Sequence, residues 1–141
     1  MTDEILVRGT AERFRAALVQ IRPNLDPRDW DLGGFIEFPD SSCEDSSTLL
    51  AVYFAESGLG AWEVVSGGSP DVGLGSHAWV EQDGLIVDIT ASQQEWPNPD
   101  VWLTSRPGWH DQFNETNRAP AEIREELAEL YLRLKRLAHE L

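Results

Sequence analysis

Residues Ser76–Thr90 read SHAWVEQDGLIVDIT, and this stretch decides the fold. Two runs rich in β-branched and aromatic residues flank Asp83-Gly84. An Asp-Gly pair between such runs is a strong signal for a two-residue hairpin turn. With that turn Gln82 pairs with Leu85, and successive side chains of each strand point to opposite faces. We therefore predict an antiparallel hairpin here.

The predicted pairing gives the hairpin two faces of different composition. The face that we expect to meet the core carries Ala78, Val80, Leu85, Val87 and Ile89. The opposite face carries His77 and Asp88, which become diagonal neighbours about 7–8 Å apart at the backbone. An imidazole and a carboxylate reach each other across that gap, whereas a one-residue slip in register would separate them.

The only cysteine, Cys43, lies at the predicted start of a helix that ends near Gly58. Ser42 suits the N-cap, and Asp45 stands at the spacing of a capping box. The apolar residues that recur at helical spacing are Leu49, Leu50, Tyr53 and Phe54. Unpaired N–H groups and the helix dipole favour a thiolate at this place, although Glu44 and Asp45 oppose it.

The chain as a whole predicts one α+β domain over residues 1–141. The other expected elements are a helix over 10–21 capped by Thr10, an irregular stretch over 22–40 with a short strand near 34–38, a strand over 61–67, an irregular stretch over 91–118, and a long helix over 119–140 with Pro120 in its first turn. The apolar spacing of the last helix favours packing on the core over dimerisation, and leaves open both a monomer and a dimer through this helix.

Composition limits the partners and the compartment. The formal net charge of −14 argues against nucleic acid and anionic membranes, because both reward Lys and Arg. It permits a basic peptide or protein as partner. No run is long and apolar enough to cross a membrane, and the N-terminus lacks the layout of a signal peptide. A single cysteine fits a reducing compartment, so we expect a cytoplasmic protein.

Cysteine, histidine and aspartate in this arrangement form a set of nucleophile, base and orienting group. Cys43 would attack a carbonyl, His77 would transfer the proton, and Asp88 would orient the imidazole. We expect the three side chains to meet in one open groove. The backbone N–H of Cys43 would help to hold the oxyanion, with a second donor among Ser41, Ser42, Gln93 and Gln94. A rival base is His110, in a loop that could fold over the site. There is no HExxH and no cysteine pair, so we expect no metal and no cofactor.

The Ser42-Cys43 pair at a helix start, the run His77-Ala78-Trp79-Val80-Glu81 and the strand that carries Asp88 resemble the transglutaminase-like branch of the papain-like cysteine superfamily. The resemblance covers roughly residues 35–95. It implies a Cys-bearing helix packed on a small antiparallel sheet, and a triad of Cys43, His77 and Asp88. We expect an amide of a peptide or of a Gln or Asn side chain as substrate, with Trp79, Ser42 and Gln93 as substrate-binding residues.

The alternative is a binding module on the same fold, such as an adaptor or immunity-type protein that captures a basic partner through its acidic surface. Glu37 and Phe38 stand where papain-like enzymes often place a Gln or Trp donor. This departure and the charge favour the binding module, whereas the His-Ala-Trp-Val-Glu run favours the enzyme.

Overall fold

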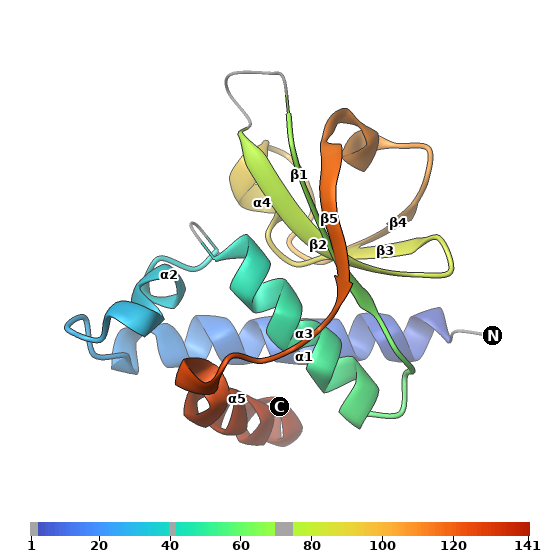
Figure 1. The fold of residues 1–141 in the computed structure, drawn as a ribbon. Helices are drawn as coiled ribbons and strands as arrows, with labels where there is room; N and C mark the ends of the chain where they lie inside the picture. The colour runs from blue at the N-terminus through green and yellow to red at the C-terminus, as the bar shows by residue number, and fades with distance from the viewer. Residues whose placement is uncertain (1–2, 40–41, 70–74) are drawn as a thin grey trace.

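The computed structural model describes residues 3–39, 42–69 and 75–141 of the chain. It has a mixed architecture of helices and one antiparallel sheet, which confirms the predicted α+β class (Figure 1). The five strands stand in the order β4-β3-β2-β1-β5. Their bounds are β1 Glu63–Gly68, β2 Ser76–Gln82, β3 Leu85–Asp88, β4 Trp102–Ser105 and β5 Asn114–Pro120. The three long helices are α1 Glu4–Ile21, α3 Cys43–Glu56 and α5 Ala128–Glu140.

Short helical turns connect these elements. They are η1 Arg22–Asn24, η2 Trp30–Leu32, α2 Gly33–Ile36, α4 Ala91–Gln94, η3 Trp109–Gln112 and η4 Glu125–Leu127.

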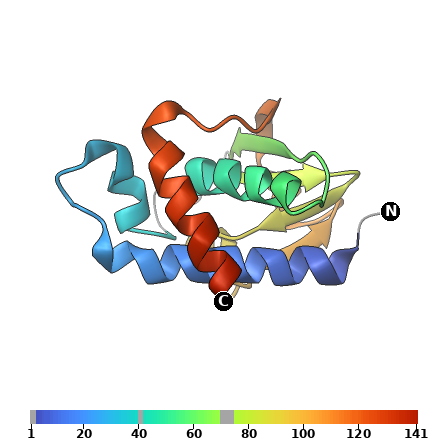
Figure 2. The same cartoon turned by 90° about the horizontal axis from the view of Figure 1, so that it is seen from below.

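The long helices form a layer against one face of the sheet. Helix α3 lies on β1 and β2, and α5 packs across α1, as Figure 2 shows from below. The core between the layers is fully buried and joins Phe14 of α1, Phe54 of α3 and Leu134 of α5 to Val80 and Val87 of the hairpin. The inner face predicted for the hairpin is therefore the face that meets the core.

The hairpin has the predicted register. Gln82 pairs with Leu85, and Val80 pairs with Val87. Asp83 and Gly84 form the turn with φ values of 49° and 83°, and positive φ at both turn positions is the geometry that matches the twist of the strands.

The second face of the sheet is also buried, which the sequence did not indicate. A smaller apolar cluster of Val65, Trp79, Ile86 and Phe113 lies there, with Trp109 packed against it. The segment between β4 and β5 covers this face, and the Arg106 guanidinium fastens it by donating to Glu81 at 3.1 Å. The groove that we expected to be open on this side is therefore closed over His77 and Asp88.

The prediction for the first helix was wrong at its start. Helix α1 begins at Glu4, because the Asp3 side chain caps it by accepting from the N–H groups of Ile5 and Leu6. Thr10 is buried within the helix instead of capping it. The strand expected near 34–38 is also wrong, since Gly33–Ile36 forms the helical turn α2.

The second half of the chain contains two strands that the sequence pattern missed. β4 and β5 lie in stretches predicted as irregular, and Pro120 ends β5 instead of opening a helix. The last helix therefore starts at Ala128, not near residue 119. The reason is non-local, because β5 pairs with β1, more than 45 residues away in the sequence, and local propensity does not report such pairing.

Helix α5 buries Leu130, Leu134 and Ala138 against the rest of the chain, in agreement with core packing. Dimerisation through it stays a prediction. None of the helices in the described part of the chain is long and apolar enough to cross a bilayer.

Two adjacent glycines of β1 give a test of the β1–β5 pairing. A Cβ at Gly67 would lie 2.3 Å from the Asn114 carbonyl oxygen, whereas a Cβ at Gly68 meets nothing within 4 Å. We expect Gly67→Ala to lower the free energy of unfolding by about 1–3 kcal/mol, because backbone must move to relieve the clash. Gly68→Ala, the matched control, should stay within about 0.5 kcal/mol. Urea unfolding measures both, and equal stability of the two variants would contradict the pairing.

Candidate active site

Cys43 is the first residue of α3 and its thiol is free and partly exposed. The first backbone bond of the helix runs from the N–H of Ser46 to the carbonyl of Ser42 at 2.8 Å. The N–H groups of Cys43, Glu44 and Asp45 therefore have no partner within the helix. These N–H groups form the positive end of the helix dipole, and Cys43 lies at that end.

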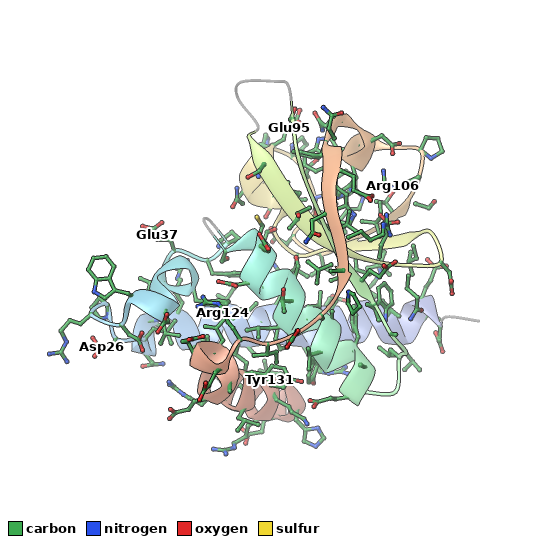
Figure 3. All side chains as sticks on the ribbon, in the orientation of Figure 1. Asp26, Glu37, Glu95, Arg106, Arg124 and Tyr131 are labelled. Atoms are coloured by element: carbon green, nitrogen blue, oxygen red, sulfur yellow. The ribbon has the colours of Figure 1, made fainter. Side chains whose placement is uncertain are left out.

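The predicted capping box at this helix start was wrong. Ser42 occupies the N-cap position but makes no capping hydrogen bond, and its hydroxyl is buried without a partner among the described residues. The Asp45 carboxylate does not turn back toward Ser42, because it accepts from Arg124 at 3.1 Å. Arg124 lies in the segment that leads into α5 (Figure 3), so the start of α3 is tied to the C-terminal part of the chain.

His77, on β2, joins the thiol to the carboxylate. Its Nε2 lies 2.7 Å from Oδ2 of Asp88, and its ring also hydrogen-bonds the Cys43 side chain. Burial lowers the pKa of His77, but the hydrogen bonds and charges of Asp88 and Cys43 outweigh it and raise the pKa to about 9. The structure thus brings together the three residues that the sequence singled out, from a helix and two adjacent strands.

Asp88, the last residue of β3, is fully buried. Burial raises the pKa of its carboxyl, but hydrogen bonds from His110 and His77 overcome this and hold the pKa well below its ordinary value. Oδ1 accepts from the backbone N–H of Thr90 at 2.9 Å. The carboxylate is therefore ionised, and because it only accepts, Nε2 of His77 carries a proton toward it, which leaves Nδ1 as the ring nitrogen that faces the thiol.

Two hollows meet at Cys43. The larger, of about 610 Å³, is lined by Ser42, Cys43, Glu44, Asp45, Ser76, Gln93, Gln94 and Arg124. The smaller, of about 330 Å³, is lined by Cys43, Glu44, Ser66, Gly67, Gly68, Ser76, His77 and Ala78. An extended segment laid over the thiol would occupy both, and the exposed Glu44 borders both. Asp45 is neutralised by its ion pair with Arg124.

Gln94 contacts His77, whereas the sequence indicated it only as one of four candidates for the second oxyanion donor. Its side-chain nitrogen donates to the Ser76 carbonyl at 2.9 Å and lies 3.2 Å from Nδ1 of His77. It therefore touches the same ring nitrogen that faces the thiol. The Thr90-Ala91-Ser92-Gln93-Gln94 sequence gave no spacing signal for this contact, which depends on α4 folding back beside β2.

The other residues expected at the site divide into two groups. Ser42 and Gln93 line the larger hollow, as a substrate-binding role requires. Trp79 is fully buried, donates to Glu81 at 3.0 Å and lines neither hollow, so substrate contact is not supported for it. Ser41, another candidate donor, lies outside the described residues.

Glu37 and Phe38 do not border the thiol. Phe38 is fully buried in the core, and Glu37 projects outward beyond the end of α2 (Figure 3). Of the three tryptophans in the long connection, Trp102 and Trp109 pack against each other and hold the loop, with ring centroids 5.6 Å apart. Trp96 is exposed.

His110, considered as a rival base, has a different place. Its Nε2 lies 2.7 Å from Oδ2 of Asp88, and its Nδ1 is buried without a hydrogen-bond partner in the described part of the chain. His77, Asp88 and His110 bring possible ligand atoms within 4.8 Å of one another. The 2.7 Å contacts are hydrogen-bond lengths, whereas zinc bonds of about 2.1 Å would hold tetrahedral ligands roughly 3.4 Å apart. The expectation of no metal and no cofactor stays a prediction.

In comparisons with family models, with curated proteins and with solved structures, nothing matches this chain.

The raised pKa of His77 predicts how stability depends on pH. The folded pKa is about 9 against an ordinary 6.5, so the protonated ring stabilises the fold fully below pH 6.5, and this contribution is lost as pH rises through 9. We expect the free energy of unfolding to fall by up to about 3 kcal/mol over this window, measured by urea titration at each pH. His77→Gln should remove the slope, and His139→Gln, at an exposed position on α5, should retain it. A flat profile for the parent protein would count against the ion pair.

Proposed function

We propose that this chain is a cysteine-dependent hydrolase or acyl transferase that acts on an amide bond of a peptide or of a Gln or Asn side chain. The observation that carries the proposal is the continuous contact from the half-buried Cys43 thiol to His77 and on to the buried Asp88 carboxylate. A transglutaminase-like, papain-like fold is the architecture that fits this order of residues on a helix and two adjacent strands.

The chemistry follows from the positions of the protons. His77 takes the proton of Cys43 on Nδ1, and the thiolate attacks the substrate carbonyl carbon to form a tetrahedral oxyanion. His77 then gives that proton to the leaving nitrogen, the C–N bond breaks, and a thioester remains on Cys43. Water or an amine gives its proton to His77 and attacks the thioester, and the C–S bond breaks to restore the thiol.

The oxyanion needs donors close to the thiol. The N–H of Cys43 has no partner within the helix, and the Gln94 side chain lies beside the same hollow. Gln94 would supply the second donor by releasing Nδ1 of His77 when substrate enters. Ser42 is the alternative second donor, because its buried hydroxyl has no partner among the described residues.

A binding module that captures a basic partner is the second candidate, and one observation favours it. The Gln94 side-chain nitrogen lies 3.2 Å from Nδ1 of His77, so it competes with the Cys43 thiol for the ring nitrogen that would take the thiol proton. The net charge of −14 suits the same reading.

Alkylation by iodoacetamide separates the two candidates. An activated Cys43 should react well below pH 8, because the thiolate is the reacting form. His77→Ala should slow the reaction at pH 6–7 by about tenfold or more, and His139→Ala should not change it. A parent rate that matches free cysteine at every pH would reject the enzyme in favour of the binding module.

The charge of the cleft predicts the charge of the substrate. Glu44 borders both hollows while Asp45 is paired with Arg124, so a cationic group should be favoured beside the thiol. We expect a cationic methanethiosulfonate to modify Cys43 faster than an anionic one. Glu44→Gln should lower this ratio by up to about thirtyfold, since two unit charges 4 Å apart in water interact by roughly 1 kcal/mol and the two reagents are affected in opposite directions.

High salt should reduce the same ratio, because it screens charges at the surface. Glu129→Gln, at an exposed position on α5, is the matched control and should leave the ratio unchanged. An equal preference for both reagents in the parent protein would rule out a basic substrate.

A further inference from the structure

The Asp88 carboxylate binds two histidines through a single oxygen. Oδ2 lies 2.7 Å from Nε2 of His77 and 2.7 Å from Nε2 of His110, and all three side chains are at most 1% exposed. The second oxygen is occupied by the N–H of Thr90. The carboxylate is thus fixed from three directions, and one of the three is a residue to which the proposed chemistry gives no part.

The protonation of His110 follows from its surroundings. Nε2 must carry a proton in order to donate to the carboxylate. Nδ1 is buried and has no hydrogen-bond partner among the described residues, and a second N–H there would be buried without an acceptor, which is costly. His110 therefore donates to the carboxylate from Nε2.

Aromatic rings prevent His110 from turning away. Its ring centroid lies 4.8 Å from that of Trp79, 5.2 Å from Trp102 and 4.9 Å from Trp109. The segment that carries it is held just before η3 and within it. Arg106 bonds Glu81 and Asp111, and Asp111 accepts from the N–H of Gly108 at 2.7 Å.

We propose that His110 is a positioning residue of the thiol site, which fixes the Asp88 carboxylate and through it the orientation and tautomer of His77. This inference rests on the proposed function. Without His110, Oδ2 would have His77 as its only partner, whereas two donors on Oδ2 hold that oxygen more firmly against Nε2 of His77. The ring of His77 is then kept with Nδ1 toward Cys43.

His110 also keeps the buried carboxylate ionised. Burial raises the pKa of Asp88, and the hydrogen bond from His110 is the foremost effect that lowers it again. The ionisable groups near this assembly are Cys43 from α3, His77 and Glu81 from β2, and Arg106 and Asp111 from the covering segment. Arg106 and Arg118 both pair with Glu81, so among the described residues the side chains that donate to Oδ2 of Asp88 are the two histidines.

The test compares His110→Phe, which keeps a ring of similar size without a donor, with His110→Gln, which keeps a side-chain N–H. The rate of iodoacetamide alkylation of Cys43 is measured from pH 5 to 9. In His110→Phe the acid limb should move up by about one pH unit, which is a tenfold loss of rate at a fixed pH on that limb. His110→Gln should keep the parent profile. A structural role alone would lower stability in His110→Phe and leave the profile in place, and that result overturns the proposal.

A second measurement needs no variant and no activity. In the parent protein labelled with ¹⁵N-histidine, both buried rings should carry a proton on Nε2, and these two N–H protons should be shifted downfield by the shared carboxylate. A His110 ring protonated at Nδ1 overturns the inference. If Cys43 alkylates like free cysteine while both downfield protons are present, the proposed function fails and the positioning geometry stands, so the two failures are distinguishable.

Discussion

The buried carboxylate of Asp88 is the group on which the rest of the site depends. A charge taken out of water is costly unless it is fully hydrogen-bonded. Asp88 meets this requirement with two imidazoles and one backbone N–H. Each partner comes from a different segment: β2, the η3 turn, and the residues just after β3. These hydrogen bonds therefore fix where the three segments meet. The hydrogen bond to His77 links the carboxylate to the thiol at the start of α3.

The site is divided between a buried half and an accessible half. His77, Asp88 and His110 lie beneath the segment between β4 and β5, which is held by Arg106 and by the contact between Trp102 and Trp109. Cys43 stands at the junction of two hollows, with the positive end of a helix behind it and Glu44 beside it. Such a division suits thiol chemistry, because exclusion of water strengthens the hydrogen bonds that orient the base, while the reacting sulfur stays within reach of a partner.

In the second half of the chain, pairing between distant strands overrides the secondary structure that the local sequence pattern predicts. Pro120 and the acidic residues after it suggested the first turn of a helix. The backbone as far as Pro120 instead pairs with β1 and forms one edge of the sheet. The connection rich in tryptophan and proline looked irregular, yet it contributes β4, which pairs with β3. The start of α1 was missed for a local reason, since Asp3 and Thr10 are both acceptable caps and only the first is used.

The sequence by itself determined the hairpin, its register and the cysteine at a helix start. These features depend on contacts between residues close in sequence. Their β propensities and the alternation of their side chains can be recognised directly in the sequence. It also determined that Cys43, His77 and Asp88 would be able to meet. Only the tertiary structure decided that the second face of the sheet is covered, that Gln94 touches the ring nitrogen facing the thiol, and that His110 shares the carboxylate. These contacts join segments separated by 17 to 25 residues, and their free energy arises from burial and charge compensation that exist only after the chain has folded.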